Sequence, residues 1–255
     1  MRMNTRKRGI IDMSVKDNRI FSWMDTVRYI EQTKTLNDVQ KGSLIIMSTF
    51  LEFDGQGRLI TPDGEYLTAN KLVKILGKSR KTVNRILDNC EYAGLLFTEA
   101  IGKDRNITFT PSVFGCGHLE IQPESSYVKV FKIKVRKLVK ELSLKDLGFL
   151  ADLLPHFHKD SYILCENPTW NGFEGMRAYT ESGLQKLFGL DKRTLNGKIK
   201  KLRACGFLMI TLGRSEVYYV SPEFVSRKNK KETLEYIQKV ATEYSDNFKD
   251  ENLLK

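Results

Sequence analysis

The stretch LTANKLVKILGKSRKTVNRILDNCEYAGLLF, residues 67–97, recurs without a gap as YTESGLQKLFGLDKRTLNGKIKKLRACGFLM, residues 179–209. Identical residues occupy matching positions at a constant offset of 112: Thr68/Thr180, Leu72/Leu184, Lys74/Lys186, Gly77/Gly189, Thr82/Thr194, Asn84/Asn196, Gly94/Gly206 and Leu96/Leu208. Self-similarity at a fixed spacing indicates an architecture of repeated units. The chain is therefore expected to contain two similar modules in tandem.

Each copy has the pattern of two short helices joined by a tight turn. In the first copy Thr68 can cap a helix that runs through Leu76, and Gly77 can end it in the left-handed conformation. Ser79 can cap the next helix, whose apolar residues recur at i, i+4 and i+7: Val83, Leu87 and Cys90. The same positions are repeated in the second copy by Thr180, Gly189 and Asp191. The pattern predicts a helix-turn-helix in each module.

A β-hairpin is expected after each helix pair. The segments LLFTEAIG and ITFTP flank GKDRN in the first copy, and FLMITLG and VYYVSPEFV flank RSE in the second. Both hairpins close alike, in TFTPSVF and in YVSPEFV. The expected fold class is therefore α+β, mainly α, with two tandem winged-helix domains, each a helix-turn-helix followed by a β-hairpin wing.

Further elements are predicted on either side of the helix pairs. A helix near residues 22–33 is predicted from apolar residues at helical spacing: Trp23, Val27 and Ile30. Asn37 can cap a second helix, and Ser143 can cap its counterpart in the second half. The segment SYVKVFKIKV predicts a strand that leads into a short basic helix, and YILCE predicts a small strand. An insertion, NPTWNGFEGMRA, follows that strand and has no counterpart in the first copy.

The chain divides into five expected segments: a basic N-terminal arm (1–19), a first winged-helix domain (20–115), a linker (116–126), a second winged-helix domain (127–226), and a C-terminal helix and tail (227–255). The C-terminal helix is predicted from one apolar stripe: Leu234, Ile237, Val240, Ala241 and Tyr244. Such a stripe can dock on its own domain or form a contact between two copies of the chain.

The composition excludes several classes of protein. With 255 residues, of which 41% are hydrophobic, the chain is long and apolar enough to bury two cores. No stretch approaches the length of about 18 consecutive apolar residues typical of a membrane span. The four cysteines, Cys90, Cys116, Cys165 and Cys205, have no CxxC spacing. No GxGxxG, GxxxxGK[ST], GxSxG or HExxH motif occurs. We expect a soluble cytoplasmic protein that has reduced thiols, no membrane partner, no cofactor and no enzymatic activity.

The charge of the chain favours binding to a polyanion. Its formal net charge is +11 and its pI is near 9.4. In a helix-turn-helix the second helix lies in the major groove, where arginine can pair with guanine and asparagine with adenine. The candidate DNA-binding residues are Lys78, Ser79, Arg80, Lys81, Thr82, Asn84 and Arg85 in the first copy, Lys192, Arg193, Thr194, Asn196, Lys198 and Lys200 in the second, and Lys103, Arg105 and Arg214 at the hairpin tips.

The two copies are not equivalent. Asp191 stands where the first copy has Ser79, so it can cap the helix or accept a hydrogen bond from a cytosine amino group. Gly197 replaces Arg85 and weakens the helix by about 1 kcal/mol relative to alanine. The second copy can therefore bind a different half-site, hold mainly the DNA backbone, or serve in dimerisation.

One other group of residues resembles a metal site. Nitrogen and sulfur ligands for zinc could come from Cys116, His118, His156, His158 and Cys165 if the linker folded onto the second module. The spacings in CGH and HFH match no familiar zinc motif, so no metal site is predicted.

The stretch TANKLVKILGKSRKTVNRILDNCEYAGLL, with the hairpin ending TFTPSVFG, resembles the winged-helix domains of Firmicute plasmid replication proteins of the RepL type and of the wider MarR-like group of regulators. SRKTVNRI and EYAGLL match the core of those families closely, whereas DKRTLNGK departs from it at Gly197 and Lys198. In layout only, the chain is also similar to plasmid initiators with two tandem winged helices, in which one module can also mediate dimerisation. The resemblance implies a winged-helix fold over roughly residues 36–115 and 142–225.

These observations predict sequence-specific binding to double-stranded DNA. The expected role is regulation of transcription for a phage or another mobile element. Two alternatives stay open: a replication initiator that binds origin repeats, and a winged-helix protein-interaction module that docks on a polymerase or another partner. Polymerase or replication proteins are possible protein partners. A homodimer is a further expected partner.

Overall fold

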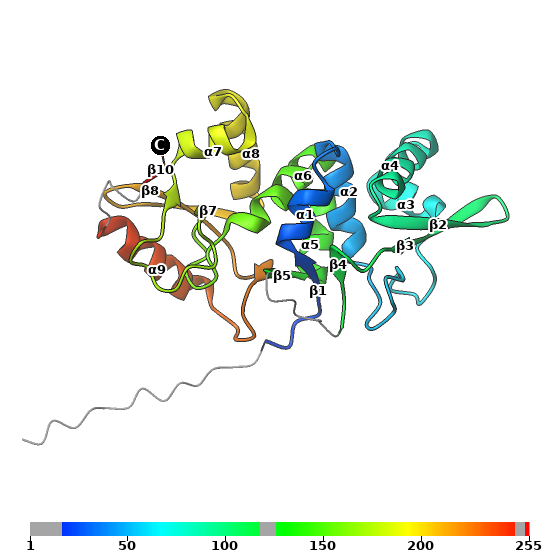
Figure 1. The fold of residues 1–255 in the computed structure, drawn as a ribbon, viewed down its shortest axis with the longest axis horizontal. Helices are drawn as coiled ribbons and strands as arrows, with labels where there is room; N and C mark the ends of the chain where they lie inside the picture. The colour runs from blue at the N-terminus through cyan, green and yellow to red at the C-terminus, as the bar shows by residue number, and fades with distance from the viewer. Residues whose placement is uncertain (1–16, 118–125, 248–252, 255) are drawn as a thin grey trace, which may run out of the picture.

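The computed structural model describes residues 17–117, 126–247 and 253–254 (Figure 1). It has a mixed α+β fold in which helices pack with small sheets, and this confirms the predicted α+β class. Most of the predicted N-terminal arm, most of the predicted linker and part of the C-terminal tail lie outside the described residues. None of the described helices is both long enough and apolar enough to cross a membrane.

The two halves of the chain contain the same order of main elements. In the first half these are β1 (Phe21–Asp25), α1 (Thr26–Gln32), α2 (Asp38–Ser48), α3 (Ala69–Leu76), α4 (Arg80–Tyr92), β2 (Leu96–Ile101), β3 (Asp104–Phe109) and β4 (Phe114–Gly115). In the second half they are β5 (Tyr127–Phe131), α5 (Lys132–Lys137), α6 (Leu144–Leu153), α7 (Glu181–Phe188), α8 (Lys192–Ala204), β7 (Leu208–Leu212), β8 (Glu216–Val220) and β9 (Val225–Ser226). Two 3-10 turns, η1 (Leu138–Lys140) and η2 (Leu154–His156), flank α6, and α9 (Leu234–Asp246) follows β9. Short β6 (Ala178–Tyr179) pairs in parallel with β10 (Leu253–Leu254).

The helix predicted near residues 22–33 is only partly correct, because its first third is strand β1. The strand pairs on one side with β4 and on the other with β5, so its backbone groups are satisfied by a sheet. Asp25 then caps α1 by accepting from the N–H groups of Val27 and Arg28. Val27 and Ile30, whose spacing predicted the helix, are 44% and 45% exposed. Pairing with distant strands overrides the local helical spacing.

The predicted helix caps are confirmed. A side chain accepts from a backbone N–H in the first turn of the next helix at each of Thr68, Ser79, Ser143, Thr180 and Asp191. Asn37 forms a full capping box with Gln40. Gly77 and Gly189 end α3 and α7 in the left-handed conformation, with φ of 59° and 61°, which glycine adopts without strain.

A four-stranded antiparallel sheet joins the two halves. Its strand order is β4-β1-β5-β9, so each half contributes two neighbouring strands. In the central pair Trp23 lies opposite Lys129, and the ladder extends symmetrically to Phe21 opposite Phe131 and Asp25 opposite Tyr127. Because β1, α1 and α2 begin 106 residues before β5, α5 and α6, Trp23 is paired with its own counterpart. The sheet therefore has a local two-fold axis between Trp23 and Lys129.

The helices α2 and α6 pack against each other with the same symmetry. Gly42 of α2 lies on the backbone of Leu144, and its counterpart Gly148 of α6 lies on the backbone of Asp38. A Cβ atom at either glycine would come closer than 3.0 Å to a carbonyl oxygen of the other helix. Glycine is thus required here for close approach. The predicted segments 20–115 and 127–226 are therefore joined by two features: the close contact between α2 and α6 and the shared sheet.

The C-terminal helix α9 packs on the second hairpin. Of the two predicted alternatives, the structure shows docking on its own domain. Its apolar stripe is buried at Ile237, Val240 and Ala241. The hydroxyl groups of Thr211 and Thr242 lie 3.1 Å apart, and the N–H of Gly213 donates to Ser245 Oγ at 2.9 Å. The helix therefore covers the outer side of β7 and β8 within its own chain.

Candidate nucleic-acid interface

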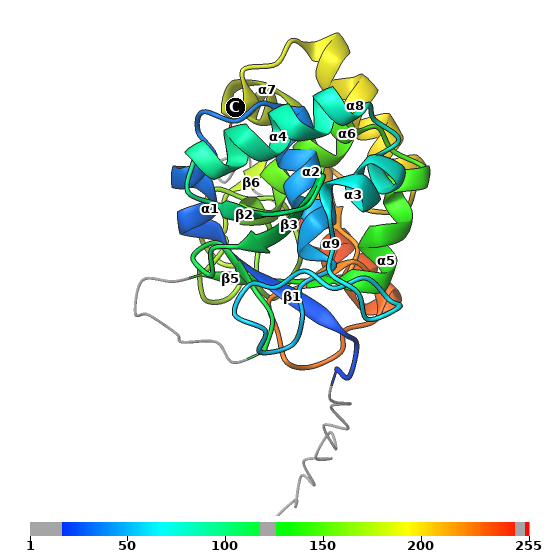
Figure 2. The ribbon, with the colours of Figure 1, turned by 90° about the vertical axis from the view of Figure 1, so that its right-hand side faces the viewer.

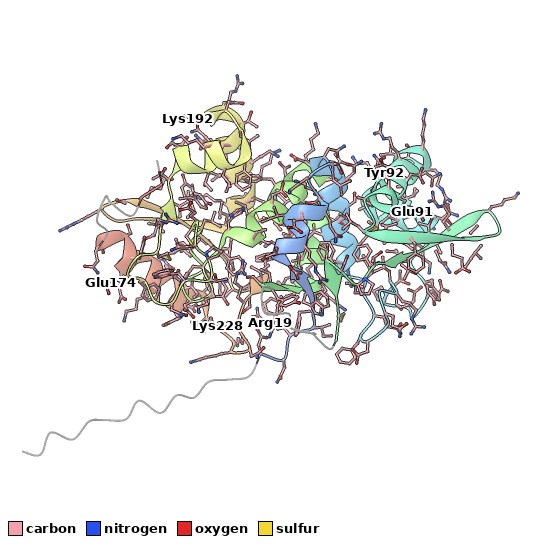
Figure 3. All side chains as sticks on the ribbon, viewed as in Figure 1. Arg19, Glu91, Tyr92, Glu174, Lys192 and Lys228 are labelled. Carbon is pink, nitrogen blue, oxygen red and sulfur yellow. The ribbon has the colours of Figure 1, made fainter. Side chains whose placement is uncertain are left out.

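The helices α4 and α8 lie along one edge of the molecule, opposite the sheet formed by β1 and β5 (Figures 1 and 2). We call this the α4–α8 edge, defined by residues 80–92 and 192–204. The hairpins β2–β3 and β7–β8 extend from it toward opposite ends of the long axis (Figure 1). Figure 3 shows Lys192 projecting outward from this edge at the start of α8. The arrangement brings the two predicted recognition helices to the same side of the protein.

In α4 the predicted inward side is correct. Val83, Leu87 and Cys90 are fully buried, and Ile86 is 2% exposed. Ser79 Oγ caps the helix by accepting from the N–H of Thr82, and the two hydroxyl groups lie 3.0 Å apart. The outer side of α4 presents Lys81 and Arg85, and Lys78 lies just before the helix; the side chains of all three are exposed and have no hydrogen bond or ion pair with any described residue. These three cations are therefore available to a ligand.

Arg80 and Arg105, by contrast, are bound within the protein. Arg80 Nη1 donates to Asp104 Oδ1 at 3.0 Å and to the side-chain oxygen of Asn70. Arg105 lies within β3 and not at the hairpin tip as predicted, and it donates to Asp88 Oδ1 at 2.7 Å and Glu91 Oε2 at 3.1 Å. These pairs fix the hairpin against the two helices. The donors of both arginines are thus already engaged within the protein.

Asp104 is held in its charged form by this network. Burial acts to raise its pKa, but hydrogen bonds from Thr68, from the backbone of Arg105 and Asn70, and from Arg80 outweigh that effect and leave the pKa below its ordinary value. An ionised Asp104 keeps Arg80 engaged at neutral pH.

Two other predicted DNA-binding residues of the first half, Asn84 and Lys103, differ in exposure. Asn84 is half-buried, and its Oδ1 atom is buried without a hydrogen-bond partner among the described residues. Lys103 is exposed in the turn between β2 and β3, beside Gly102 with φ of 57°. Of the two residues predicted at the tip of the first hairpin, Lys103 lies there and Arg105 does not.

The helix α8 repeats this plan with a different cap. Asp191 accepts from the N–H of Thr194 at 3.0 Å and from its hydroxyl at 2.6 Å, and these bonds lower the pKa of Asp191. The apolar side is formed by Leu195, Ile199 and Leu202. Arg193 and Lys200 are exposed on this helix, without a partner among the described residues. The capping role expected for Asp191 is confirmed.

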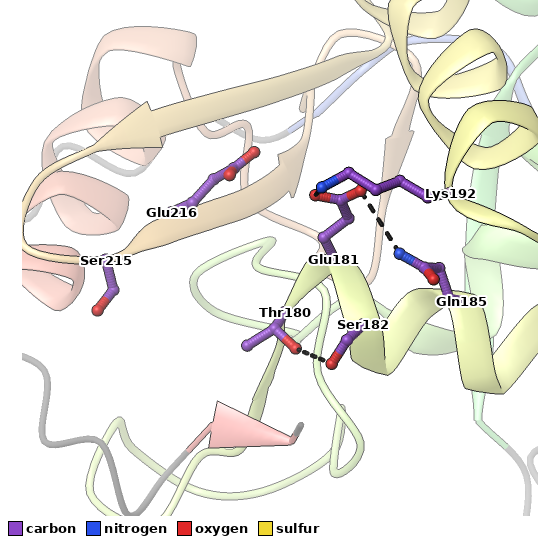
Figure 4. A pocket seen from close by; sticks show the side chains of 7 residues that line it. All are labelled: Thr180, Glu181, Ser182, Gln185, Lys192, Ser215 and Glu216. Carbon is purple, nitrogen blue, oxygen red and sulfur yellow. Dashed lines mark hydrogen bonds and ion pairs between the residues drawn. The ribbon is translucent and has the colours of Figure 1, made fainter.

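A carboxylate on α7 engages two predicted residues of α8. Glu181 Oε1 accepts from Asn196 Nδ2 at 3.1 Å, and Glu181 Oε2 lies 3.6 Å from Lys192 Nζ. Glu181, Lys192 and Glu216 line a hollow between α7, α8 and the second hairpin (Figure 4). The two carboxylates make this hollow a poor site for phosphate, and Glu181 already engages two donors of α8, Asn196 and Lys192.

The predicted DNA contact of Lys198 is not supported by the structure. Its Nζ atom donates to Asp38 Oδ2 at 2.8 Å and lies 5.2 Å from the ring centre of Phe149. Its side chain is only 13% exposed, because it lies at the junction between α8 and the N-terminus of α2. Lys201 is likewise bound, to Asp146 of α6 at 3.0 Å. Both lysines connect α8 to the central helix pair.

The second hairpin presents Arg214 in its turn, exposed and without a partner in the described part of the chain. The sequence analysis did not name the cation Lys145. Lys145, in the first turn of α6, is exposed and shares a shallow hollow with Arg193 and Thr194. It belongs to an earlier helix, so the repeat gave no signal for it.

Replacing Gly197 tests the free outer side of α8. This glycine is exposed within the helix, and a Cβ atom there would meet nothing within 4 Å. Gly197→Ala is expected to raise the free energy of unfolding by about 1 kcal/mol, because alanine loses less backbone entropy in a helix. Urea denaturation would measure the change. A loss of stability would contradict the open environment of this position.

The described residues among those considered for zinc do not form a site. Within residues 17–117, 126–247 and 253–254 no three His, Cys, Asp or Glu side chains are placed to hold a metal ion. His118 lies outside these ranges. His158 is held by Trp170 O at 3.0 Å and Ser161 Oγ at 3.2 Å, and His156 packs edge-on against the rings of Tyr179 and Phe188. The described histidines therefore have structural surroundings.

The burial of His156 predicts a pH dependence of stability. Burial, and then the charge of Arg227, lower its pKa from 6.5 to about 4. The unfolded chain thus binds a proton at a higher pH than the folded chain does. Above pH 6.5 this histidine is expected to leave the free energy of unfolding unchanged. As the pH drops from 6.5 toward 4, the free energy of unfolding is expected to fall by up to about 1.4 kcal/mol per pH unit. Urea denaturation of wild type and His156→Gln over this range measures the effect, and identical pH profiles would contradict it.

Comparison of the chain with protein-family models, with curated proteins and with solved structures finds no match. The functional argument therefore depends on the arrangement of charges at the α4–α8 edge.

Proposed function

We propose that the protein binds double-stranded DNA sequence-specifically through two winged helices, with α4 and α8 as recognition helices. One observation carries the proposal: exposed cations whose side chains have no partner among the described residues lie on these helices, in the turn before α4 and in the hairpin turns. They are Lys78, Lys81, Arg85 and Lys103 in the first half and Arg193, Lys200 and Arg214 in the second. We call them the exposed cation set.

The physical chemistry of the interface supports this assignment. A capped helix directs its free N–H groups and first-turn side chains outward, where they suit phosphate oxygens. Internal pairs such as Arg80–Asp104 and Lys198–Asp38 hold the scaffold, so the exposed cation set loses no internal bond on binding. The net charge of +11 adds long-range attraction to a polyanion.

Salt titration tests the proposal with the full chain. The probe is a pool of fluorescent duplexes of random sequence, and binding is followed by anisotropy. The logarithm of the affinity is expected to fall linearly with the logarithm of the salt concentration, by about 0.9 for each phosphate contacted. Weak binding without salt dependence would overturn the proposal and favour a module that docks on a polymerase or another protein.

We further propose that this binding regulates transcription for a phage or another mobile element. The role depends on where the sites lie, so footprinting on DNA from the source genome distinguishes it. Protection of sequences that overlap promoters is the expected result. Protection of repeated sites beside an AT-rich origin would instead assign the protein to replication initiation.

A further inference from the structure

We infer that one chain binds one composite DNA site made of two unlike half-sites in inverted orientation, with α4 on one half and α8 on the other. This inference rests on the proposed function. It also replaces the homodimer expected from the sequence with a two-fold arrangement built into a single chain.

The first support is the register of the central strands. Trp23 lies opposite Lys129, and these residues are counterparts in the two halves. The outer strands follow the same rule, because Gly115 pairs with Trp23 as Ser226 pairs with Lys129. Pairing of a strand with its own counterpart in antiparallel orientation is the geometry of an isologous two-fold interface.

The second support is the packing of α2 on α6. Gly42 on Leu144 and Gly148 on Asp38 are equivalent contacts, since each glycine meets the counterpart of the residue that the other meets. The contact leaves no space for a side chain, so the two halves are fixed in one relative orientation. A contact of this closeness within the chain already uses the surfaces that a dimer of single modules would need.

The third support is that each helix pair sits in the same frame within its half. The N–H of Phe109 donates to Gly57 O at 2.8 Å, and the counterpart N–H of Val220 donates to Tyr162 O at 3.0 Å. The N–H of Leu67 bonds Leu59 O at 2.8 Å, as that of Tyr179 bonds Leu164 O at 2.9 Å. The two-fold relation of the sheet and the central helices therefore extends to α4 and α8.

The two-fold symmetry of the protein can coincide with a two-fold axis of duplex DNA. The phosphate backbone of a duplex has dyad axes perpendicular to the helix axis, and two recognition helices related by a protein two-fold bind inverted half-sites, about 10 base pairs or a multiple of that apart. Both α4 and α8 lie on the same side of the molecule (Figures 1 and 2). Direct repeats would require the two halves to be related by translation instead.

The half-sites must differ because the recognition helices differ. Arg85 is replaced by Gly197, and Lys78 is replaced by Leu190. On α8 the side-chain nitrogens of Asn196 and Lys192 contact Glu181. On α4 the side-chain nitrogens of Lys81 and Arg85 have no acceptor among the described residues. We therefore expect more stringent base preference in the half-site bound by α4.

Selection of bound duplexes from a random pool, with the full chain, tests the inference. The expected motif has two unlike halves in inverted orientation at a fixed spacing, and native mass spectrometry of the selected duplex gives one chain per duplex. Turning one half into a direct repeat at the same spacing is expected to weaken binding by about 100-fold. Arg85→Ala is expected to relax one half of the motif, and Arg193→Ala the other. Both side chains are exposed, so folding is preserved.

The outcomes separate the two levels of the argument. Enrichment of direct repeats, of a single half-site, or of complexes with two chains per duplex would overturn the inverted arrangement while leaving DNA binding intact. Failure to enrich any duplex would overturn the proposed function itself.

Discussion

Replacing Gly148 with alanine is expected to lower the free energy of unfolding by about 3 kcal/mol. The added methyl group would overlap the carbonyl oxygen of Asp38, which belongs to the backbone of α2 and cannot rotate away as a side chain could. The central helices would have to separate, and this would expose apolar surface on both halves of the chain. Urea denaturation followed by circular dichroism measures the loss, through a shift of the midpoint at constant slope.

Two further variants control this result. Gly42→Ala should cost a similar amount, because its methyl group would meet the carbonyl oxygen of Leu144 in the counterpart position. Gly197→Ala adds the same methyl group to a helix without a neighbour, so it should not destabilise the protein. Unchanged stability in both Gly42→Ala and Gly148→Ala would show that the halves are not locked at this helix contact.

The second large effect is expected on DNA binding. The double variant Lys81→Ala/Arg85→Ala removes two exposed cations from the outer side of α4, where neither has a partner among the described residues. Affinity for a selected duplex is expected to fall by about 10- to 100-fold, as for the loss of one or two base or phosphate contacts. If both contact phosphates, the slope of log affinity against log salt should become shallower by about 1.8.

Lys239→Ala is the matched control for the double variant. Lys239 is 76% exposed on α9, away from the α4–α8 edge, and its only described partner is Glu243 at 3.8 Å. It removes a surface lysine in the same way, and its effect on affinity should be within about twofold, since a screened and distant charge contributes little. Equal losses in both variants would indicate a nonspecific effect of net charge, and the proposed recognition role of α4 would be lost.

Local signals in the sequence determined the helix pairs and their hairpins. A cap such as Ser79 acts within three residues, and the spacing of Val83, Leu87 and Cys90 acts within two helical turns. Because each of these interactions is complete within one element, the sequence alone predicted where α3, α4, α7 and α8 begin and which side α4 buries. The α+β class followed from the same signals.

Contacts between distant elements could not be predicted in this way. Residues 21–25 form a strand because two other strands are placed beside them, although Trp23 stands at helical spacing from Val27 and Ile30. Arginine is the residue type expected at a DNA contact. In the folded protein, however, Arg80 forms an ion pair with Asp104, and Arg105 forms ion pairs with Asp88 and Glu91. Lys198 is bound by Asp38, which lies 160 positions earlier in the chain.

The repeat itself, the caps and the positive charge were thus determined by the sequence, since propensity and periodicity act over short distances. Only the tertiary structure decided which cations are free and that the two halves are related by a two-fold axis. The physical reason is that an ion pair or a close glycine contact depends on the distance between atoms of different elements, and packing alone sets that distance.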